Sequence, residues 1–413
     1  MKNYINRMAI LLWMAICAFQ AQAQDLNGVW TGQLTIGQQR LSLVFHVDMG
    51  QRQVLLDVPE QGAKGIPTSL DHLSPDSIHL QIPTIGLRFH GRLLGDILRG
   101  TFSQNGFTQT IDCKRGQQEY RRPQTPSLPL PYTTENVTFQ NTKAGVTLSG
   151  TLSLPKDYKA GHTPIVLFVT GSGLQNRDEE LFYHKPFLVI ADALARAGIA
   201  SLRYDDRGVA QSTGDFKTAT TFDFANDAEA GLQFLRNKKA FGKIGIIGHS
   251  EGGMIAYILG SQKKTDFIVS LAGPATRIDT LMCLQLNKLN RVAAPTAPAL
   301  TSAKQARETL IKLSPDPWTR TFVDIDMTTY IRKVTCPVLH LNGSLDLNVP
   351  AELTIPALRK YLPRHKKTLI KEYPGLNHLF QHATTGHPSE YVTIEETTSP
   401  EVLNDMISWI KQL

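Results

Sequence analysis

Residues 244–260 read I-G-I-I-G-H-S-E-G-G-M-I-A-Y-I-L-G. An apolar run leads into polar residues set between glycines, and a second apolar run follows at helical spacing. The stretch predicts a buried strand, a sharp turn and a buried helix, with Ser250 at the tip of the turn. Such a turn strains its central residue, and larger neighbours than glycine would collide with the adjoining strand and helix. The pattern G-x-S-x-G at 248–252 is typical of a nucleophilic serine in this setting.

Strands and helices alternate on both sides of this turn. Apolar runs predict strands, and stretches with helical period predict helices, at 165–169, 186–197, 199–204, 222–236, 243–247, 267–271, 338–342, 368–373 and 400–411. The strand candidates are apolar on both faces, as strands covered by helices on both sides must be. The alternation predicts a domain of the α/β class over 132–413, with a mostly parallel sheet flanked by helices.

Residues 275–333 interrupt this alternation. The stretch is helical in character and carries large apolar side chains, among them Leu281, Trp318 and Phe322. In open parallel sheets, ligands bind outside the carboxyl ends of the strands. We therefore expect this insertion to form a helical cap over that edge of the sheet.

The first part of the chain has a different period. Between 24 and 120, apolar and polar residues alternate in several short runs separated by glycine and proline, which predicts a small antiparallel β barrel or sandwich. Its opening Gly28-Val29-Trp30 resembles the G-x-W of lipocalin-like barrels. Four prolines in 121–131 favour a stiff linker between two domains, with a surface loop inside one domain as the alternative.

The first 23 residues have the pattern of a secretory signal peptide. Lys2 and Arg7 precede an uncharged stretch at 8–19, and the small-x-small sequence Ala21-Gln22-Ala23 follows. The uncharged stretch is too short to span a bilayer, so we expect cleavage and no stable membrane insertion. This predicts a secreted or periplasmic protein.

Composition excludes several classes of function. The formal net charge of +7 is spread over dispersed lysines and arginines, which argues against a nucleic-acid partner. Beyond the signal peptide, Cys113, Cys283 and Cys336 lie far apart, and an odd number argues against a disulfide framework, although one bridge stays open. Spacings typical of zinc ligands are lacking, so we expect no metal and no organic cofactor. The sequence indicates no oligomeric state.

A serine hydroxyl needs a base, and the base needs an orienting acid. In this arrangement the acid and the histidine follow the serine in the chain. Asp346 lies just beyond the strand at 338–342, and His378 lies just beyond the strand at 368–373. We predict these two as the partners of Ser250. The alternatives are His382 or His387 as the base and Asp324 or Asp326 as the acid, whereas His340 reads as a packed core histidine.

Acyl transfer also needs hydrogen-bond donors for the developing oxyanion. The backbone N–H of Glu251, directly after the nucleophile, is the first candidate. The second comes from the turn Thr170-Gly171-Ser172-Gly173, where small residues let the backbone approach a substrate. We predict the N–H of Ser172, with that of Gly173 as the alternative.

These stretches together resemble the α/β-hydrolase superfamily, specifically serine esterases of its dienelactone-hydrolase-like and acyl-peptidase-like branch. The resemblance is carried by G-S-G-L-Q-N-R-D, R-Y-D-D-R-G-V-A-Q-S, G-H-S-E-G-G, L-A-G-P, C-P-V-L-H-L-N-G-S-L-D and P-G-L-N-H-L-F-Q, from 171 to 381. It implies the same triad of Ser250, Asp346 and His378.

One position departs from the family pattern, because Ala210 stands where the related enzymes usually have glycine. This puts the backbone conformation of its loop in question. In the same region, Asp206 and Arg207 are interpreted as a structural ion pair. Arg177 and Asp178 either contact substrate or brace the loop.

We predict a secreted serine carboxylesterase that hydrolyses short-chain or carbohydrate-linked esters through an acyl-enzyme intermediate. Ser250 attacks the ester carbonyl, His378 takes and returns the proton, and Asp346 holds the imidazole. Its expected partner is a small-molecule or carbohydrate ester. The alternatives are a serine aminopeptidase or acyl-peptidase-like hydrolase, and a non-catalytic envelope or glycan-binding protein.

Overall fold

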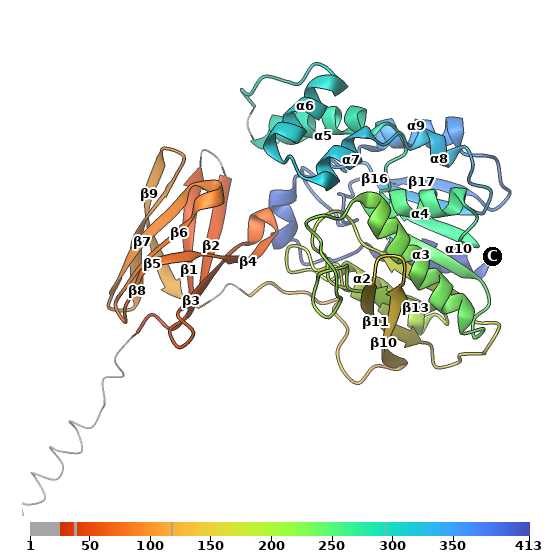
Figure 1. The fold of residues 1–413 in the computed structure, drawn as a ribbon, viewed down its shortest axis with the longest axis horizontal. Helices are drawn as coiled ribbons and strands as arrows, with labels where there is room; N and C mark the ends of the chain where they lie inside the picture. The colour runs from red at the N-terminus through yellow and green to blue at the C-terminus, as the bar shows by residue number, and fades with distance from the viewer. Residues whose placement is uncertain (1–24, 37–38, 117–118, 294) are drawn as a thin grey trace, which may run out of the picture. The chain divides into compact units, whose positions relative to one another are not determined.

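The structure, a computed structural model, describes residues 25–36, 39–116, 119–293 and 295–413. The chain divides into two compact units, residues 1–119 and 120–413 (Figure 1). The predicted signal peptide lies outside the described residues. Each unit has a hydrophobic core of its own.

The first unit is an antiparallel sheet. Its strands within the described residues are β1 (Gly28–Ile36), β2 (Gln39–Asp48), β3 (Gln53–Val58), β4 (Ala63–Pro67), β5 (Ser69–Leu73), β6 (Ser77–Ile82), β7 (Leu87–Leu94), β8 (Ile97–Gln104) and β9 (Phe107–Arg115). The 3₁₀ helices η1 (Pro59–Gln61) and η2 (Pro83–Ile85) lie between them. The order is β4-β3-β2-β1-β9-β8-β7-β6-β5, and β3 also contacts β5, so the sheet is nearly closed.

The alternation seen in the sequence sets the two faces of this sheet. Leu43, Phe45 and Val47 of β2 are buried, and so are Ile78 and Leu80 of β6. A strand places successive side chains on opposite faces, so the apolar set lines the inside of the curved sheet. The predicted antiparallel β domain is confirmed in this barrel-like form.

The second unit is built on a mostly parallel sheet. Its strands within the described residues are β10 (Thr133–Asn141), β11 (Val146–Leu154), β12 (Ile165–Val169), β13 (Ala200–Tyr204), β14 (Ile244–His249), β15 (Phe267–Leu271), β16 (Val338–Gly343) and β17 (Leu369–Tyr373). Their order is β10-β11-β13-β12-β14-β15-β16-β17, and every pairing from β13 to β17 is parallel. The predicted α/β architecture is confirmed.

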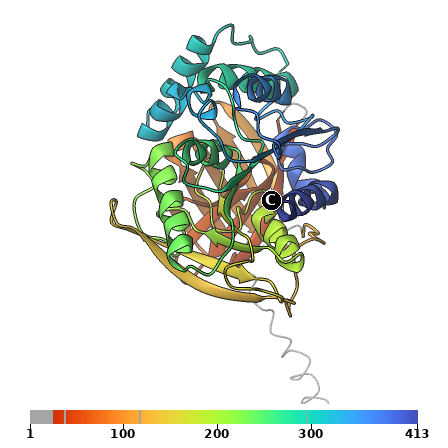
Figure 2. The ribbon, with the colours of Figure 1, turned by 90° about the vertical axis from the view of Figure 1, so that its right-hand side faces the viewer.

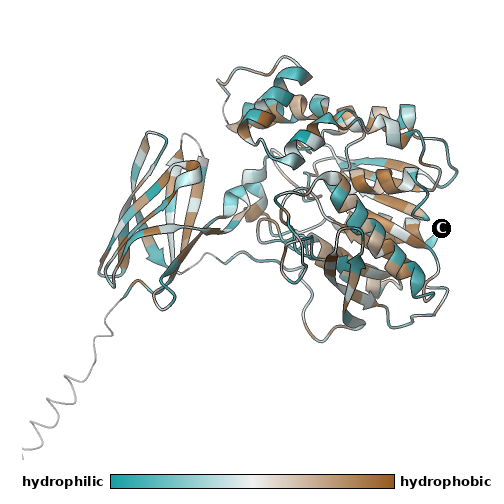
Figure 3. Cartoon of the chain, in the orientation of Figure 1, coloured by the Kyte–Doolittle hydropathy of each residue, from teal (hydrophilic) through white to brown (hydrophobic). Residues whose placement is uncertain are grey.

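Helices cover both faces of this sheet (Figure 2). They are α2 (Pro186–Arg196), α3 (Thr221–Asn237), α4 (Glu251–Ser261), α9 (Ala351–Tyr361) and α10 (Pro400–Lys411), with a 3₁₀ helix η3 (Pro388–Thr393). Helices α3 and α4 pack against each other, as do α2 and α10. Strands β12, β13 and β15 are buried at every position, and Figure 3 shows hydrophobic residues along the strands of this sheet. Burial on both faces explains why these strands read as continuous apolar runs.

The predicted cap consists of helices inserted between β15 and β16. They are α5 (Ile278–Ala293), α6 (Ala303–Leu313), α7 (Pro317–Asp324) and α8 (Thr328–Ile331). Helix α5 packs against both α6 and α7, while α7 reaches α3. The insertion is therefore helical, as the sequence indicates.

Two further findings concern the described ranges only. Their cysteines, Cys113, Cys283 and Cys336, are free thiols, so the bridge left open by the sequence is not formed. None of the helices in these ranges combines the length and the apolar character that crossing a bilayer requires.

Candidate functional site

Ser250 occupies the turn between β14 and α4 in a strained conformation, with φ 53° and ψ −117°. Its backbone N–H donates to the carbonyl oxygen of Leu271 at 2.8 Å. A Cβ at Gly248 would lie 2.1 Å from the carbonyl oxygen of Gly252, and one at Gly252 would lie 2.0 Å from that of Val169. Both positions must be glycine, because backbone atoms fill the space that a side chain would need.

Asp346 and His378 meet at the carboxyl ends of neighbouring strands. Asp346 follows β16, His378 follows β17, and their Oδ2 and Nδ1 atoms lie 2.8 Å apart. The other carboxylate oxygen accepts the backbone N–H groups of Asn348 and Val349 at 2.9 and 2.7 Å. Asn342 donates to Oδ2 at 3.1 Å. These bonds fix the carboxylate, and they leave Nε2 of His378 as the ring nitrogen able to take up a proton.

Ser250 and His378 line the same cavity, whose volume is about 300 Å³. Its walls also include Ser172 from the turn after β12 and apolar side chains of the cap helices, among them Met282 and Trp318. Within the described residues, the Ser250 hydroxyl has no hydrogen-bond partner, so a bond to His378 is not formed here. In unliganded enzymes, catalytic hydrogen bonds are often long and tighten only when substrate binds.

The alternative acids and bases lie elsewhere and do not line this cavity. His382 pairs with Glu396 at the surface, and His387 bonds to Ser389. Asp324 pairs with Arg307, and the carboxylate of Asp326 accepts the N–H of Thr328. His340 is fully buried, bonds to Tyr257, Ser270 and Asn342, and has its pKa lowered to about 4 by burial.

The turn after β12 (Thr170, Gly171, Ser172 and Gly173) is called the oxyanion turn here because the sequence predicts an oxyanion donor in it. It is held by buried carboxyl groups. The hydroxyl of Thr170 donates to Asp206 at 2.8 Å, and the N–H of Gly171 donates to Glu179 at 2.8 Å. The backbone N–H of Ser172 makes no hydrogen bond within the described ranges. The backbone N–H of Glu251 lies in the first turn of α4, where an N–H has no acceptor within the helix.

Glu251 is buried, and its Oε1 accepts the Thr221 hydroxyl at 2.6 Å and the Trp318 indole N–H at 2.9 Å. The residue thus joins the turn at Ser250 to α3 and to the cap helix α7. Burial raises the pKa of Glu251 above its ordinary value of 4.5, although these hydrogen bonds lower it in part.

We expect Glu251→Gln to equal the wild type in free energy of unfolding near about pH 4, and to exceed it near about pH 8. With the folded pKa raised, the unfolded chain ionises first, so wild-type stability falls as pH rises from 4.5 toward the folded pKa. Glutamine cannot ionise, so the variant gains about 1.4 kcal/mol for each pH unit by which the folded pKa exceeds the unfolded one. Urea unfolding across this range measures the difference. A difference that stays constant with pH contradicts the expectation.

A second histidine–carboxylate pair lies beside the cavity. His249 Nδ1 lies 3.0 Å from Glu179 Oε1, and His249 Nε2 lies 3.0 Å from the carbonyl oxygen of His378. Both side chains are buried and line the cavity wall. Sequence reasoning missed this pair. The histidine of G-H-S-E-G was visible, but the burial of Glu179 in a polar loop carries no pattern.

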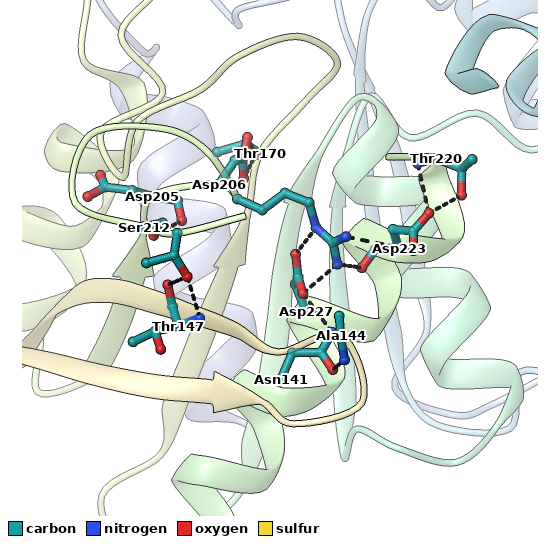
Figure 4. Close-up of polar contacts among 12 residues, drawn as sticks. Asn141, Ala144, Thr147, Thr170, Asp205, Asp206, Ser212, Thr220, Asp223 and Asp227 are labelled. Atoms are coloured by element: carbon teal, nitrogen blue, oxygen red, sulfur yellow. Dashed lines mark hydrogen bonds and ion pairs between the residues drawn. The ribbon is translucent and has the colours of Figure 1, made fainter. Parts of the chain in front are cut away.

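Ion pairs and hydrogen bonds fix the loop that follows β13. The predicted pair of Asp206 with Arg207 is wrong: Arg207 binds Asp227 of α3 at 2.7 Å, while Asp206 accepts the Thr170 hydroxyl. Asn141 donates to the same Asp227 at 2.7 Å (Figure 4). The error arose because Arg207 lies in the turn that begins at Asp206, where the two neighbouring side chains bind different partners.

The sequence left open whether Arg177 and Asp178 contact substrate or brace their loop. Their ion pairs show the second role. Arg177 binds Asp205 at 2.6 Å, and Asp178 pairs with Arg203, so both residues brace the loop. Ala210, which stands where related enzymes have glycine, adopts φ 47°. The loop thus keeps the left-handed backbone that glycine favours.

Comparisons with known proteins find relatives in sequence and in structure. A family model described as serine aminopeptidase, S33, matches residues 184–340. Esterase EstD of Thermotoga maritima is 27% identical over 248 residues, 56% of this chain and 58% of EstD. The chain thus spans less than two thirds of this curated relative.

Among solved structures, the Pyrococcus furiosus esterase Pf2001 is similar with a TM-score of 0.46 and 17% identity, covering 72% of this chain and 97% of that one. A dienelactone hydrolase from Anabaena variabilis is similar with a TM-score of 0.43 and 18% identity, covering 68% and 98%.

Proposed function

We propose that this chain is a member of the α/β-hydrolase superfamily and a serine carboxylic-ester hydrolase that works through an acyl-enzyme intermediate. One observation carries the proposal. Ser250 sits on a strained turn that opens into the cavity lined by His378, and the ring of His378 is bonded to the fixed carboxylate of Asp346.

In the proposed reaction, His378 Nε2 takes the proton of Ser250 while the hydroxyl oxygen attacks the ester carbonyl carbon. The N–H groups of Ser172 and Glu251 stabilise the oxyanion that forms. The alcohol leaves with the proton from His378, and water then repeats the sequence to release the acid. Asp346 keeps Nδ1 protonated and stabilises the charged ring.

The proposed substrates are esters with a short acyl chain or esters linked to carbohydrate. A cavity of about 300 Å³ suits a small acyl group. Its apolar wall includes Leu281 and Phe322, and Gln175, Gln285 and Asn348 add polar groups that can bind hydroxyls. The predicted signal peptide favours export of the protein. An exported enzyme would meet such esters outside the cell or in the periplasm.

The proposal is tested with a fluorophosphonate probe and a panel of esters. We expect the probe to label one serine, which peptide mass spectrometry maps to position 250, and to abolish hydrolysis of short nitrophenyl esters. Comparing nitrophenyl acyl chains with acetylated and feruloylated sugars then identifies the acyl and alcohol groups. A protein that the probe does not label supports the non-catalytic alternative instead.

The serine aminopeptidase alternative has an observation in its favour, because the matching family model carries that description. Amides and esters pass through the same tetrahedral intermediate, so the proposed triad serves both reactions. Turnover of aminoacyl nitroanilides that exceeds turnover of nitrophenyl esters decides for the peptidase.

A further inference from the structure

The buried pair of Glu179 and His249 engages both nitrogens of one imidazole ring. Nε2 of His249 faces the carbonyl oxygen of His378 at 3.0 Å, and a carbonyl only accepts, so Nε2 carries a hydrogen. Nδ1 faces Glu179 Oε1 at 3.0 Å. That oxygen also accepts the N–H of Gly171, so it is already oriented as an acceptor. The arrangement is that of an imidazolium donating from both nitrogens to two acceptors.

The charges around His249 support this state. Burial disfavours a charged ring, but the Glu179 carboxylate, the hydrogen bonds to Glu179 and the His378 carbonyl, and the charge of Asp346 outweigh it and raise the pKa of His249. The other ionisable group against the ring is His378, whose imidazole lies with its centroid 4.6 Å away. Glu179 is completely buried, so its charge requires a partner of opposite sign.

The pair joins segments that are far apart in the chain. His249 directly precedes Ser250 on the strained turn. Its Nε2–H holds the backbone of His378, and Glu179 holds Gly171 of the oxyanion turn. Every segment that supplies a group to the proposed reaction, apart from the loop of Asp346, is therefore tied to this ion pair.

We propose that the Glu179–His249 pair positions the base and the oxyanion turn relative to Ser250, and that it does so only while His249 carries both ring hydrogens. The inference rests on the proposed function. Glu179 and His249 are positioning residues, because they act through His378 and Gly171 and contact no reacting atom.

The chemistry of the ring makes the pair testable through pH. A neutral imidazole has a single N–H and cannot donate to both acceptors. In Glu179→Gln the counter-charge is gone, so His249 becomes neutral at neutral pH. Either the ring gives up one of its two bonds, or the glutamine amide turns to donate to Nδ1 and gives up the bond to Gly171. In each case one of the ties that hold the base and the oxyanion turn is lost. Lower pH protonates the ring and restores the second donor.

We expect Glu179→Gln to lower kcat for a short nitrophenyl ester by about 100-fold while KM changes by less than about threefold. The ratio of variant to wild-type kcat should rise as the pH falls from about 8 to about 6, because a protonated His249 donates from both nitrogens and restores the lost bond. Titration of active sites with fluorophosphonate gives kcat per competent site, so a partly unfolded preparation does not mimic the effect.

His249→Asn and Asp227→Asn are the matched variants. Asparagine at 249 can donate to Glu179 but cannot reach the His378 carbonyl, so we expect a similar loss of kcat with no pH dependence of the ratio. Combined with Glu179→Gln, it should cost no more than the larger single loss. Asp227→Asn breaks a buried ion pair outside the site, at Arg207, and should change thermal stability while leaving kcat per competent site unchanged.

A ratio for Glu179→Gln that is flat with pH, or single losses that multiply in the double variant, overturns the positioning role. If Glu179→Gln does not fold, the kcat and KM of His249→Asn decide, because an unchanged kcat per competent site overturns the role as well. A wild type that hydrolyses no ester and is not labelled at Ser250 sinks the proposed function instead.

Discussion

Ser250→Ala is expected to lower kcat for a short-chain nitrophenyl ester by about a million-fold, close to the loss of the whole triad. In the proposed mechanism this hydroxyl forms the acyl-enzyme, and no other nucleophile replaces it. What remains is the stabilisation that the oxyanion turn and the cavity give to direct attack by water. Steady-state kinetics with the purified variant measures the loss.

Ser261→Ala is the matched control. Ser261 is the last residue of α4, the helix that Ser250 directly precedes. The Ser261 hydroxyl donates to the Ile258 carbonyl, away from the cavity, so the control variant should keep wild-type turnover. Ser250→Ala should melt at or above the wild-type temperature, because the hydroxyl has no hydrogen-bond partner to lose within the described residues. Near-normal hydrolysis by Ser250→Ala contradicts the nucleophile assignment.

Asp346→Asn is expected to lower kcat by about ten-thousand-fold with little change in KM. Asparagine keeps the shape of the side chain, but its amide can present an N–H to His378 Nδ1. The hydrogen then moves to Nε2, which no longer accepts the serine proton. The N–H groups of Asn348 and Val349 lose a charged acceptor, so a modest loss of stability accompanies the loss of rate.

The control for this variant is Asp324→Asn, at the other acid that the sequence offered. Asp324 pairs with Arg307 on the surface of the cap and does not line the cavity. We expect turnover within about twofold of the wild type, because exposed ion pairs contribute little. The acid assignment is wrong if Asp324→Asn loses more kcat than Asp346→Asn.

Much of the second unit could be predicted from the sequence, because burial on both faces makes its strands continuous apolar runs. The strands at 165–169 and 267–271 match exactly. The hairpin of β10 and β11 was missed, because β10 is mostly exposed and polar and gives no such run. Local patterns cannot reveal a strand whose place is set by its neighbour.

The site was predictable to the extent that chain order and strand ends locate side chains. Asp346 follows the buried strand β16, His378 follows the edge strand β17, and the two side chains meet as expected. The partners of Arg207 and His249 could not be found in this way. Asp227 and Glu179 come from segments 20 and 70 residues away, and long-range pairing of charges leaves no periodic signal in a single sequence.

The contacts around Gly248 and Gly252 leave no space for larger side chains at the turn between β14 and α4. The carbonyl of Gly252 rests where a side chain at 248 would go, and the carbonyl of Val169 does the same for 252. Strands β12 and β14 and helix α4 are thus packed backbone to backbone, and a side chain at either glycine would destabilise the fold. Diversification toward new substrates must fall instead on α5 and α7, whose side chains face the cavity without such backbone constraints.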